Sequence, residues 1–358
     1  YSNLGRSNCS NYRQRMEGAW NIMVEYLAGN RIRGLNSEKT ATTQVNADVT
    51  GGDNSYTVGT KTYRKFTTTG SSNLVIGDSS IDLEVLLVAG GGGGGGETAG
   101  GGGAGGLLYQ ASRTMTAATY PIVIGTGGAP STGRNLASNG VASTFNGASA
   151  DGGGAGGGQT VSGASGGSGG GAGQGGSGGS TTQSDSSSMT GYGSAGNSSG
   201  DGGSAGGGAH AMGGNSNSQN GAVGGDGKGG TNNSAINTML INASAGDQDG
   251  STGNYYVAGG GSGAKDHSQT GSKGGGGASG GGGNPPTGGS ATASTGSGGG
   301  GGSGSGATGG SGAAGIAIIS YTTSTSVTSP INVPDGSTFY ATDTNRSYVL
   351  SGTTWSEL

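Results

Sequence analysis

Apolar positions near the start of the chain recur at helical spacing. They predict a helix from about residue 10 to residue 28, with one apolar face made of Met16, Ala19, Trp20, Met23, Val24 and Leu27. A helix this short is marginal in water by itself, so it needs a packing partner. Two readings stay open: the helix packs within its own domain, or copies of it associate around a fibre axis.

Short apolar runs farther along the chain are typical of β-strands. We expect strands at 56–58, 62–67, 73–76, 81–88, 119–124 and 316–321. The run 81–88 alternates between apolar and polar residues and then becomes continuously apolar, so we expect it to be the most buried strand of the chain. Because 316–321 is similarly apolar, we expect these two strands to pair.

Between these two strands the sequence changes character, since residues 90–315 are almost entirely Gly, Ser, Ala, Asn and Thr. The chain holds 94 glycines in 358 residues, about a quarter of its length, against roughly 7% in an average protein. Only 28% of the residues are hydrophobic and 9% are charged. This composition cannot build the aliphatic core of an ordinary enzyme. No apolar run approaches the roughly 18 residues of a membrane span, so we expect a soluble protein without membrane insertion.

The glycine tracts are expected to be ordered. Collagen is excluded because the run 90–96 breaks the Gly-X-Y repeat, and a flexible linker is the competing reading. Against a linker, the tracts carry almost no charge and lie between two apolar strands that must meet. A threefold polyproline-II helix leaves its N–H and C=O groups free to bond neighbouring chains, and bare glycine lets such helices approach closely. We therefore expect a lattice of packed polyglycine-II helices.

The interruptions of the tracts are expected to lie outside this lattice, because residues with side chains cannot enter it. We expect turns at its ends or faces for 181–192, 210–212, 233–242, 254–257, 265–267 and 284–286.

The order of the motifs resembles a known family. The chain contains LEVLLVAGGGGGG, a GGLLYQ turn, the strand TYPIVIGTGG and a closing GIAIISY strand. In this order they resemble the glycine-rich domain of phage tail fibres and other viral structural proteins, over about residues 81–321. The polyglycine-sandwich adhesins at the tips of some tail fibres are similar more loosely. The resemblance implies a virion protein, and the adhesins imply receptor recognition by variable loops. Residues 334–355 are similar to a short β-meander common in phage structural proteins.

These observations predict a mostly β and irregular fold. A glycine-rich domain with packed polyglycine-II helices is bracketed by β-strands, with a short N-terminal helix and a C-terminal β-meander. We divide the chain into 1–72 for attachment and oligomerisation, 73–321 for the polyglycine-II domain, and 322–358 for the meander.

No motif indicates nucleotide binding or catalysis. Matches to Gly-x-Gly-x-x-Gly are expected by chance in so much glycine, and Lys228 lacks the adjacent Ser or Thr of a P-loop. No Gly-x-Ser-x-Gly stands between a strand and a helix. The net charge of −4 and the pI near 5.1 exclude a basic surface for nucleic acid. We expect no enzyme activity and no cofactor.

Metal and disulfide chemistry are not indicated either. The segment 247–250 is reminiscent of a calcium loop but lacks the third ligand and the distal Glu. His210 and His267 have no second ligand at suitable spacing, and Cys9 has no partner. The polar stretch that follows Tyr1 indicates no signal peptide.

Receptor recognition is the function that we expect. A surface without side chains cannot discriminate ligands, so specificity must lie in the interruptions. The candidate receptor-binding residues are Tyr192, His210, Met212, Tyr255, Tyr256, Lys265 and His267. For the tyrosine pair two roles stay open, plugging the lattice edge or presenting a stacking surface.

The expected partners follow from this reading. They are further copies of the chain in a homotrimer, other virion or tail proteins, and a host surface glycan or outer-membrane protein. The expected location is the virion. The alternative is a capsid decoration or connector protein without a receptor.

Overall fold

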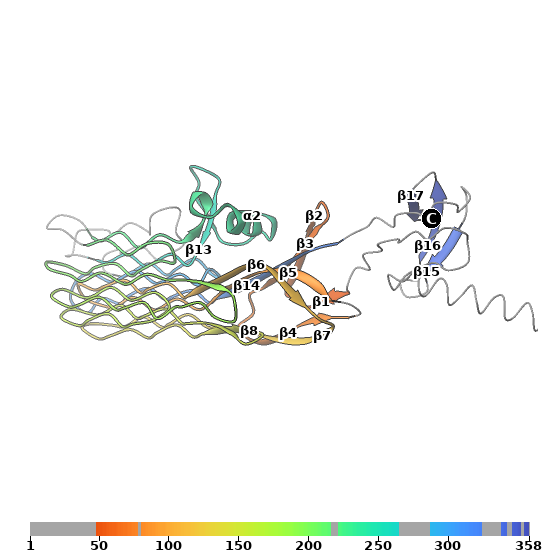
Figure 1. Ribbon diagram of the computed structural model, residues 1–358. Coiled ribbons are helices and arrows are strands. Elements are labelled where there is room, and N and C mark those ends of the chain that lie inside the picture. The colour runs from red at the N-terminus through yellow and green to blue at the C-terminus, as the bar shows by residue number, and fades with distance from the viewer. Residues whose placement is uncertain are drawn as a thin grey trace, which may run out of the picture. The chain divides into compact units, whose positions relative to one another are not determined.

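A computed structural model describes residues 48–77, 80–215, 221–264 and 287–323, and the backbone of three further strands near the C-terminus. The chain divides into two compact units, Asp48–Thr322 and the remainder (Figure 1). In the remainder, β15 (Thr338–Ala341), β16 (Arg346–Ser351) and β17 (Thr354–Glu357) form an antiparallel sheet in chain order, the predicted meander. The predicted helix at 10–28 lies outside the described residues.

Two antiparallel sheets stand at one end of the larger unit. The first has the order β1-β4-β7-β8-β9 and the second β10-β6-β5-β14-β3-β2. Their strands are β1 (Val49–Thr50), β2 (Asn54–Val58), β3 (Lys61–Phe66), β4 (Gly70–Ile76), β5 (Ile81–Val88), β6 (Leu107–Met115), β7 (Ala118–Ile124), β8 (Ser143–Phe145), β9 (Ala148–Ala150), β10 (Thr190–Tyr192) and β14 (Ile316–Thr322). The prediction of a mostly β fold is confirmed.

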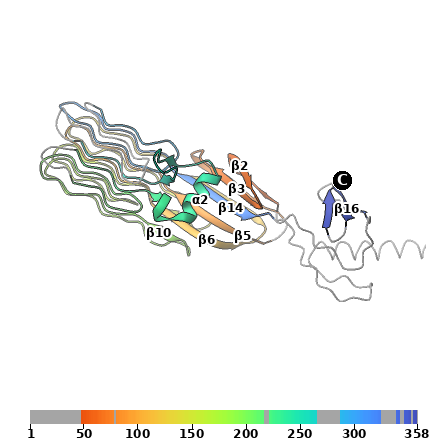
Figure 2. The same ribbon diagram turned by 90° about the horizontal axis from the view of Figure 1, so that it is seen from above.

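Side chains along β5 alternate between two buried faces, which places the six-stranded sheet between the five-stranded sheet and a helix. Leu83, Val85 and Leu87 are fully buried on one face, where β5 lies against β8 of the five-stranded sheet. Leu86 and Val88 face the opposite side and join a cluster with helix α2 (Ser234–Asn242). Figure 2 shows α2 lying across the six-stranded sheet.

The predicted pairing of the two apolar strands is confirmed, with Ile316 opposite Val88 and Ser320 opposite Glu84. The expectation that β5 is the most buried strand is wrong. In β14 every residue from Ile316 to Tyr321 is buried, whereas Asp82 of β5 is exposed. Both strands lie inside the sheet, so the difference comes from the first residues of β5, where Ile81 is half-buried and Asp82 is exposed.

Beyond the strands, the glycine tracts run side by side as threefold helices (Figure 1). Backbone N–H groups of the tract 90–95 donate to three neighbours in turn, at 2.8–3.0 Å: Gly90 and Gly93 to the segment 138–141, Gly91 and Gly94 to 310–313, Gly92 and Gly95 to 100–103. Every third residue thus bonds the same neighbour, as a threefold helix requires. Carbonyls of the tract accept from 128–131, 153–156 and 299–302.

This tract therefore has six neighbours, three of them antiparallel and three parallel. The returning tract 100–106 is also enclosed on every side, bonded to 92–95, 151–157, 168–171, 204–207, 296–299 and Gly261. Close approach is what requires glycine here, since a Cβ on Gly93 would lie 2.2 Å from the carbonyl oxygen of Ala129. The predicted lattice of packed polyglycine-II helices is the observed architecture.

The rule that side chains cannot enter the lattice is too strict. Ala104, Ala172, Ser168 and Ser204 are fully buried within it. A single carbon or a hydroxyl fits where its Cβ points between helices, and a hydroxyl can form hydrogen bonds with the surrounding backbone. The Oγ of Ser204, for example, accepts the Ala172 N–H at 2.8 Å.

Four segments predicted as turns form regular elements, wholly or in part. The GGLLYQ segment enters β6, which pairs with β5 on both sides of an irregularity between Leu83 and Val85. Residues 234–242 form α2, because Asn233 caps the helix and Ile236, Met239 and Leu240 share its buried face. Residues 255–257 form β13, which joins β11 (Lys228–Gly229) and β12 (Asp247–Gln248) in a small sheet beside the 3-10 helix η1 (Gly230–Asn232). The end of the segment 181–192 forms β10, which pairs with β6.

Candidate functional site

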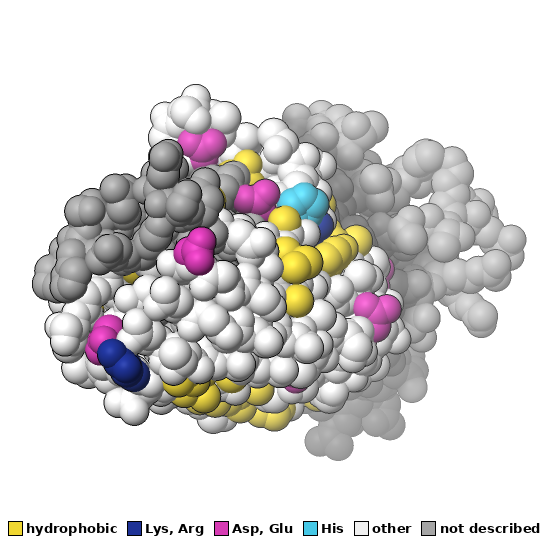
Figure 3. Space-filling model, turned by 90° about the vertical axis from the view of Figure 1, so that its left-hand side faces the viewer, with side chains coloured by type: hydrophobic (Ala, Val, Ile, Leu, Met, Phe, Trp, Pro, Cys, Tyr) yellow, Lys and Arg dark blue, Asp and Glu magenta, His cyan; other side chains and the backbone are white. Residues whose placement is uncertain are grey.

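Side chains that could take part in recognition lie in two places on the larger unit. One place is the set of turns at the lattice end farthest from the sheets, which we call the distal turns: 97–98, 132–134, 159–160, 174–175, 199–201 and 304–306. The other is the surface around α2, next to the six-stranded sheet, which we call the helix platform. Figure 3 views the molecule from the distal end, where few charged side chains break a mostly neutral surface.

Several distal turns are tied to one another by polar contacts. The Arg134 Nε lies 3.2 Å from the Glu97 Oε1, and the Gln159 Nε2 donates to the Gln174 Oε1 at 3.0 Å. The backbone adds two more contacts, because the Gln174 N–H donates to the Thr98 carbonyl and the Thr160 N–H donates to the Gln174 carbonyl. We call these six residues the distal polar cluster: Glu97, Thr98, Arg134, Gln159, Thr160 and Gln174.

The backbone of this cluster has an unusual conformation. Glu97, Thr98 and Thr160 have φ of 49°, 48° and 64°. The left-handed region is uncommon outside glycine and is unfavourable for a β-branched residue such as threonine. A backbone conformation of this kind persists only where the surrounding structure holds it in place. Here the lattice helices beneath hold both ends of each turn.

The helix platform is built around α2. Ile236, Met239 and Leu240 pack on Leu86, Val88 and Ile318 of the sheet, with half-buried Tyr56, Tyr109, Tyr192 and Tyr255 around them. At the C-terminal end of α2, the Lys65 Nζ donates to the Ser244 carbonyl at 2.9 Å. The platform is therefore a small core with a rim of tyrosines.

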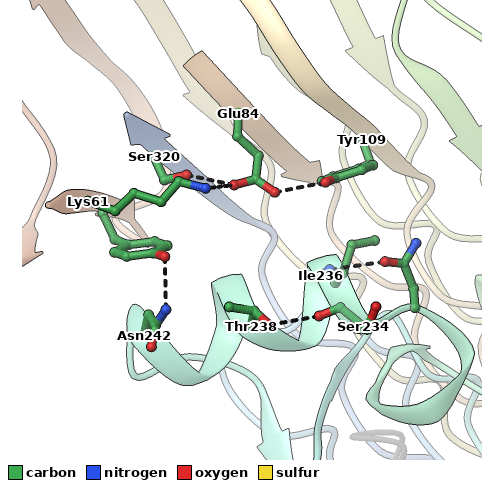
Figure 4. A network of polar contacts seen from close by, with 10 residues as sticks. Lys61, Glu84, Tyr109, Ser234, Ile236, Thr238, Asn242 and Ser320 are labelled. Carbon is green, nitrogen blue, oxygen red and sulfur yellow. Dashed lines mark hydrogen bonds and ion pairs between the residues drawn. The ribbon is translucent and has the colours of Figure 1, made fainter. Parts of the chain in front are cut away.

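A carboxylate lies between the sheet and this helix. Glu84 accepts hydrogen bonds from the Lys61 Nζ at 2.5 Å, the Tyr109 hydroxyl at 2.7 Å and the Ser320 hydroxyl at 2.8 Å (Figure 4). Burial and the neighbouring Glu84 raise the pKa of Tyr109. Since Lys61 balances its charge and hydroxyls fill its acceptor sites, Glu84 joins strands β3, β5, β6 and β14. This arrangement is that of a structural network.

Three of the sequence-predicted site residues lie at the platform. The Lys228 Nζ is 4.4 Å from the centre of the Tyr192 ring, and burial lowers the pKa of Lys228. Tyr255 is half-buried against the α2 cluster. Tyr256 is only 3% exposed and points to the other face of β13, where its ring occupies the space beside Gly230. Tyr256 is therefore part of the core beside η1 and is not exposed as a stacking surface.

His210 and Met212 lie in an exposed turn that follows the lattice segment 202–208, on the same side of the lattice as the platform. Met212 is 55% exposed. Lys265 and His267 lie outside the described residues. None of the five described candidates belongs to a distal turn.

Sequence reasoning missed the distal polar cluster. Its members stand in short interruptions without aromatic residues, such as 97–99, 159–162 and 174, whereas the predicted site residues are tyrosines, histidines, a methionine and a lysine of other segments. One signal in the sequence could have found the cluster. A polar residue midway along a glycine-rich segment marks the place where the chain, having left the sheets, must turn back toward them.

The described residues form neither a metal site nor a membrane-spanning helix. The described residues contain no group of three His, Cys, Asp or Glu side chains that could hold a metal ion. In the calcium-like segment, Asp249 accepts hydrogen bonds from Ser251 and Thr252, and these bonds lower its pKa. In the part of the chain that the structure describes, no helix has the length and apolarity to cross a bilayer.

The fold and the sites together define a glycine-rich lattice protein. Comparison with protein families agrees, since a family model described as a glycine-rich domain matches residues 66–322. The match covers more than half of the chain, so the protein belongs to this glycine-rich domain family. None of the curated proteins compared with the chain matches it.

Proposed function

We propose that the chain is a virion structural protein, a phage tail fibre or adhesin subunit whose rigid lattice presents side chains to the host cell surface. The motif order that resembles the glycine-rich domain of tail fibres supports this proposal. The same proposal places the protein on the virion, outside the cell, in contact with other tail proteins and with a surface glycan or an outer-membrane protein.

One observation carries the proposal. The chain enters and leaves the larger unit at the same end, because the Tyr321 hydroxyl of the last strand reaches the Val49 carbonyl of the first at 3.4 Å. The distal turns lie at the opposite end, separated from this point by the full length of the threefold helices (Figure 1). Attachment at one end and side-chain-bearing turns at the other is the arrangement that an adhesive tip requires.

Stiffness is the property that the lattice adds. Each interior helix is bonded to neighbours on every side, so a turn cannot move without breaking several backbone hydrogen bonds together. Turns held in one conformation lose little entropy when they bind, which favours affinity.

Self-association belongs to the proposal. Small sheets such as β15 to β17 are marginal alone, and we propose that copies of the chain assemble as a homotrimer. Light scattering on the purified chain tests this, with a trimer expected; a well-folded monomer at micromolar concentration contradicts it.

The main test is location and adsorption. Antibodies against the purified chain are expected to label tail fibre tips in electron micrographs of virions, and the free chain is expected to compete with virions for host cells. Label confined to the capsid, with no competition, favours the decoration or connector protein instead.

A further inference from the structure

The distal polar cluster has unused hydrogen-bonding capacity. We propose that it is the receptor-contacting surface and that its ligand is an anionic, hydroxyl-rich cell-surface glycan. This inference rests on the proposed function and refines it, because it moves recognition from the tyrosine-bearing segments to the distal turns.

Arg134 is the first reason. Among the described basic residues, Lys61, Arg64, Lys65 and Arg113 stand on strands of the six-stranded sheet, and Lys228 lies at the platform. Arg134 is the one in a distal turn, and its side chain is 65% exposed. Only its Nε has a hydrogen-bond partner among the described residues, Glu97, so both Nη groups are available.

The orientation of this guanidinium matters more than its charge. Glu97 is 14% exposed and its turn lies at the end of an enclosed lattice helix, so it holds Arg134 from a fixed position. The two Nη groups of such an arginine form a planar fork that fits a carboxylate or a phosphate through two parallel hydrogen bonds. A neutral sugar offers no group of this geometry.

The amides beside it supply the second part of the surface. The Gln159 Nε2 is used by Gln174, which leaves the Gln174 Nε2 without a partner among the described residues. The Gln159 Oε1 also has no partner there, but it is buried and lies beneath the contact surface. The free Gln174 amide, together with the hydroxyls of Thr98 and Thr160, suits a ligand rich in hydroxyls, whose donors and acceptors alternate.

The negative charge of the whole chain does not oppose this ligand strongly. At physiological salt, charges farther apart than about 8 Å are largely screened, so the net charge of −4 is felt only weakly at the tip. The nearest carboxylate, Glu97, is already paired with Arg134. A charge-dependent contact at an exposed site should therefore weaken as salt is raised.

The test uses the purified full chain on immobilised glycans of three kinds: neutral, carboxylate-bearing and phosphate-bearing. Wild-type protein is expected to bind an anionic class and to bind host cells, and the two anionic arms tell which anion it is. Arg134→Gln is expected to lose at least about tenfold in affinity. Arg134→Lys is expected to lose most of this as well, because lysine keeps the charge but lacks the fork.

The matched control is Arg113→Gln, at the opposite end of the unit in β6. It is expected to bind like wild type, and thermal melting of each variant verifies folding. If wild type binds cells but Arg134→Gln binds them equally, or if neutral glycans are preferred, the inference fails while the proposed function stands. If folded wild type binds neither cells nor any glycan, the receptor-binding function itself fails.

Discussion

The two ends of the larger unit are ordered by opposite means. At the sheet end, large side chains such as Leu86, Phe66 and Ile318 are excluded from water and fill the space between layers. In the lattice there is almost no side chain to bury, and backbone hydrogen bonds between threefold helices hold the structure. Burial tolerates exchange of similar side chains. A lattice built on backbone contact tolerates hardly any side chain at all.

The two ends also terminate differently. A β-sheet ends at an edge strand, here β2, β10, β1 and β9. The lattice ends where a neighbouring helix is missing, and there side chains provide the absent acceptor: the Oγ of Ser165 accepts the Ser180 N–H at 3.1 Å, and the Oδ1 of Asn139 accepts the Ala155 N–H at 2.8 Å. Serine and asparagine thus close the lattice where no glycine helix can.

The largest effect is expected from a methyl group inside the lattice. In Gly93→Ala the Cβ would lie 2.2 Å from the Ala129 carbonyl oxygen and 2.6 Å from its carbon. Neither atom can yield without moving a helix that is itself bonded to others. We expect a loss of more than about 3 kcal/mol in the free energy of unfolding, beyond the usual cost of overpacking. Chemical denaturation of the purified chain measures it.

The control for this change is Gly200→Ala in a distal turn, where nothing lies within 4 Å of the new Cβ. Its stability should stay within about 0.5 kcal/mol of wild type. Equal stability of the two variants would mean that the tracts are not packed as helices in solution, and rapid amide exchange throughout 90–106 would lead to the same conclusion.

A smaller effect is expected at the sheet end, where adjacent tyrosines allow a matched comparison. Tyr256 is buried and Tyr255 is half-buried. Tyr256→Ala should cost about 3 kcal/mol, as deletion of a buried aromatic ring does, and Tyr255→Ala clearly less. Thermal unfolding of both variants gives the comparison, and an equal cost for the two would show that β13 does not orient them as described.

Much of this fold could be predicted from the sequence. Apolar runs located six of the eleven strands in the two large sheets, and the two most apolar ones were correctly paired, because only such a partner can bury them. The packing of the glycine tracts could also be predicted, because segments without side chains can be ordered only by backbone hydrogen bonds.

The failures have a common cause in tertiary context. The helix α2 carries only three buried residues, Ile236, Met239 and Leu240, in a segment of nine, a signal too short to separate from a loop. In β6 the residues between Leu108 and Met115 are half-buried or exposed and mostly polar, and their strand conformation comes from pairing with β5. Which serines lie inside the lattice and which close its edge depends on neighbours distant in the chain.

The same limit applied to the candidate site. Aromatic residues were predicted as binding residues because they are rare in this chain. A rare large side chain can equally be part of the hydrophobic core, as Tyr256 is. The polar residues 97–98 and 134 are far apart in sequence, and nothing local indicates that Glu97 and Arg134 meet. Only the lengths of the helices beneath bring these turns together.

The smallest effect is expected at the lattice edge and concerns Ser165. Ser165→Ala removes the hydroxyl that accepts the Ser180 N–H but leaves the backbone bond from Gly166 N–H to the Ser180 carbonyl. Because this edge is exposed, water can replace the lost acceptor, so the cost should be about 0.5–1 kcal/mol. Amide exchange should accelerate at Ser180 and remain slow at interior Gly93. Ser184→Ala, whose hydroxyl bonds no other described residue, serves as the control and should change neither. If exchange at Ser180 is unaltered, edge serines are not what closes the lattice, and the difference between its edges and those of the sheets disappears.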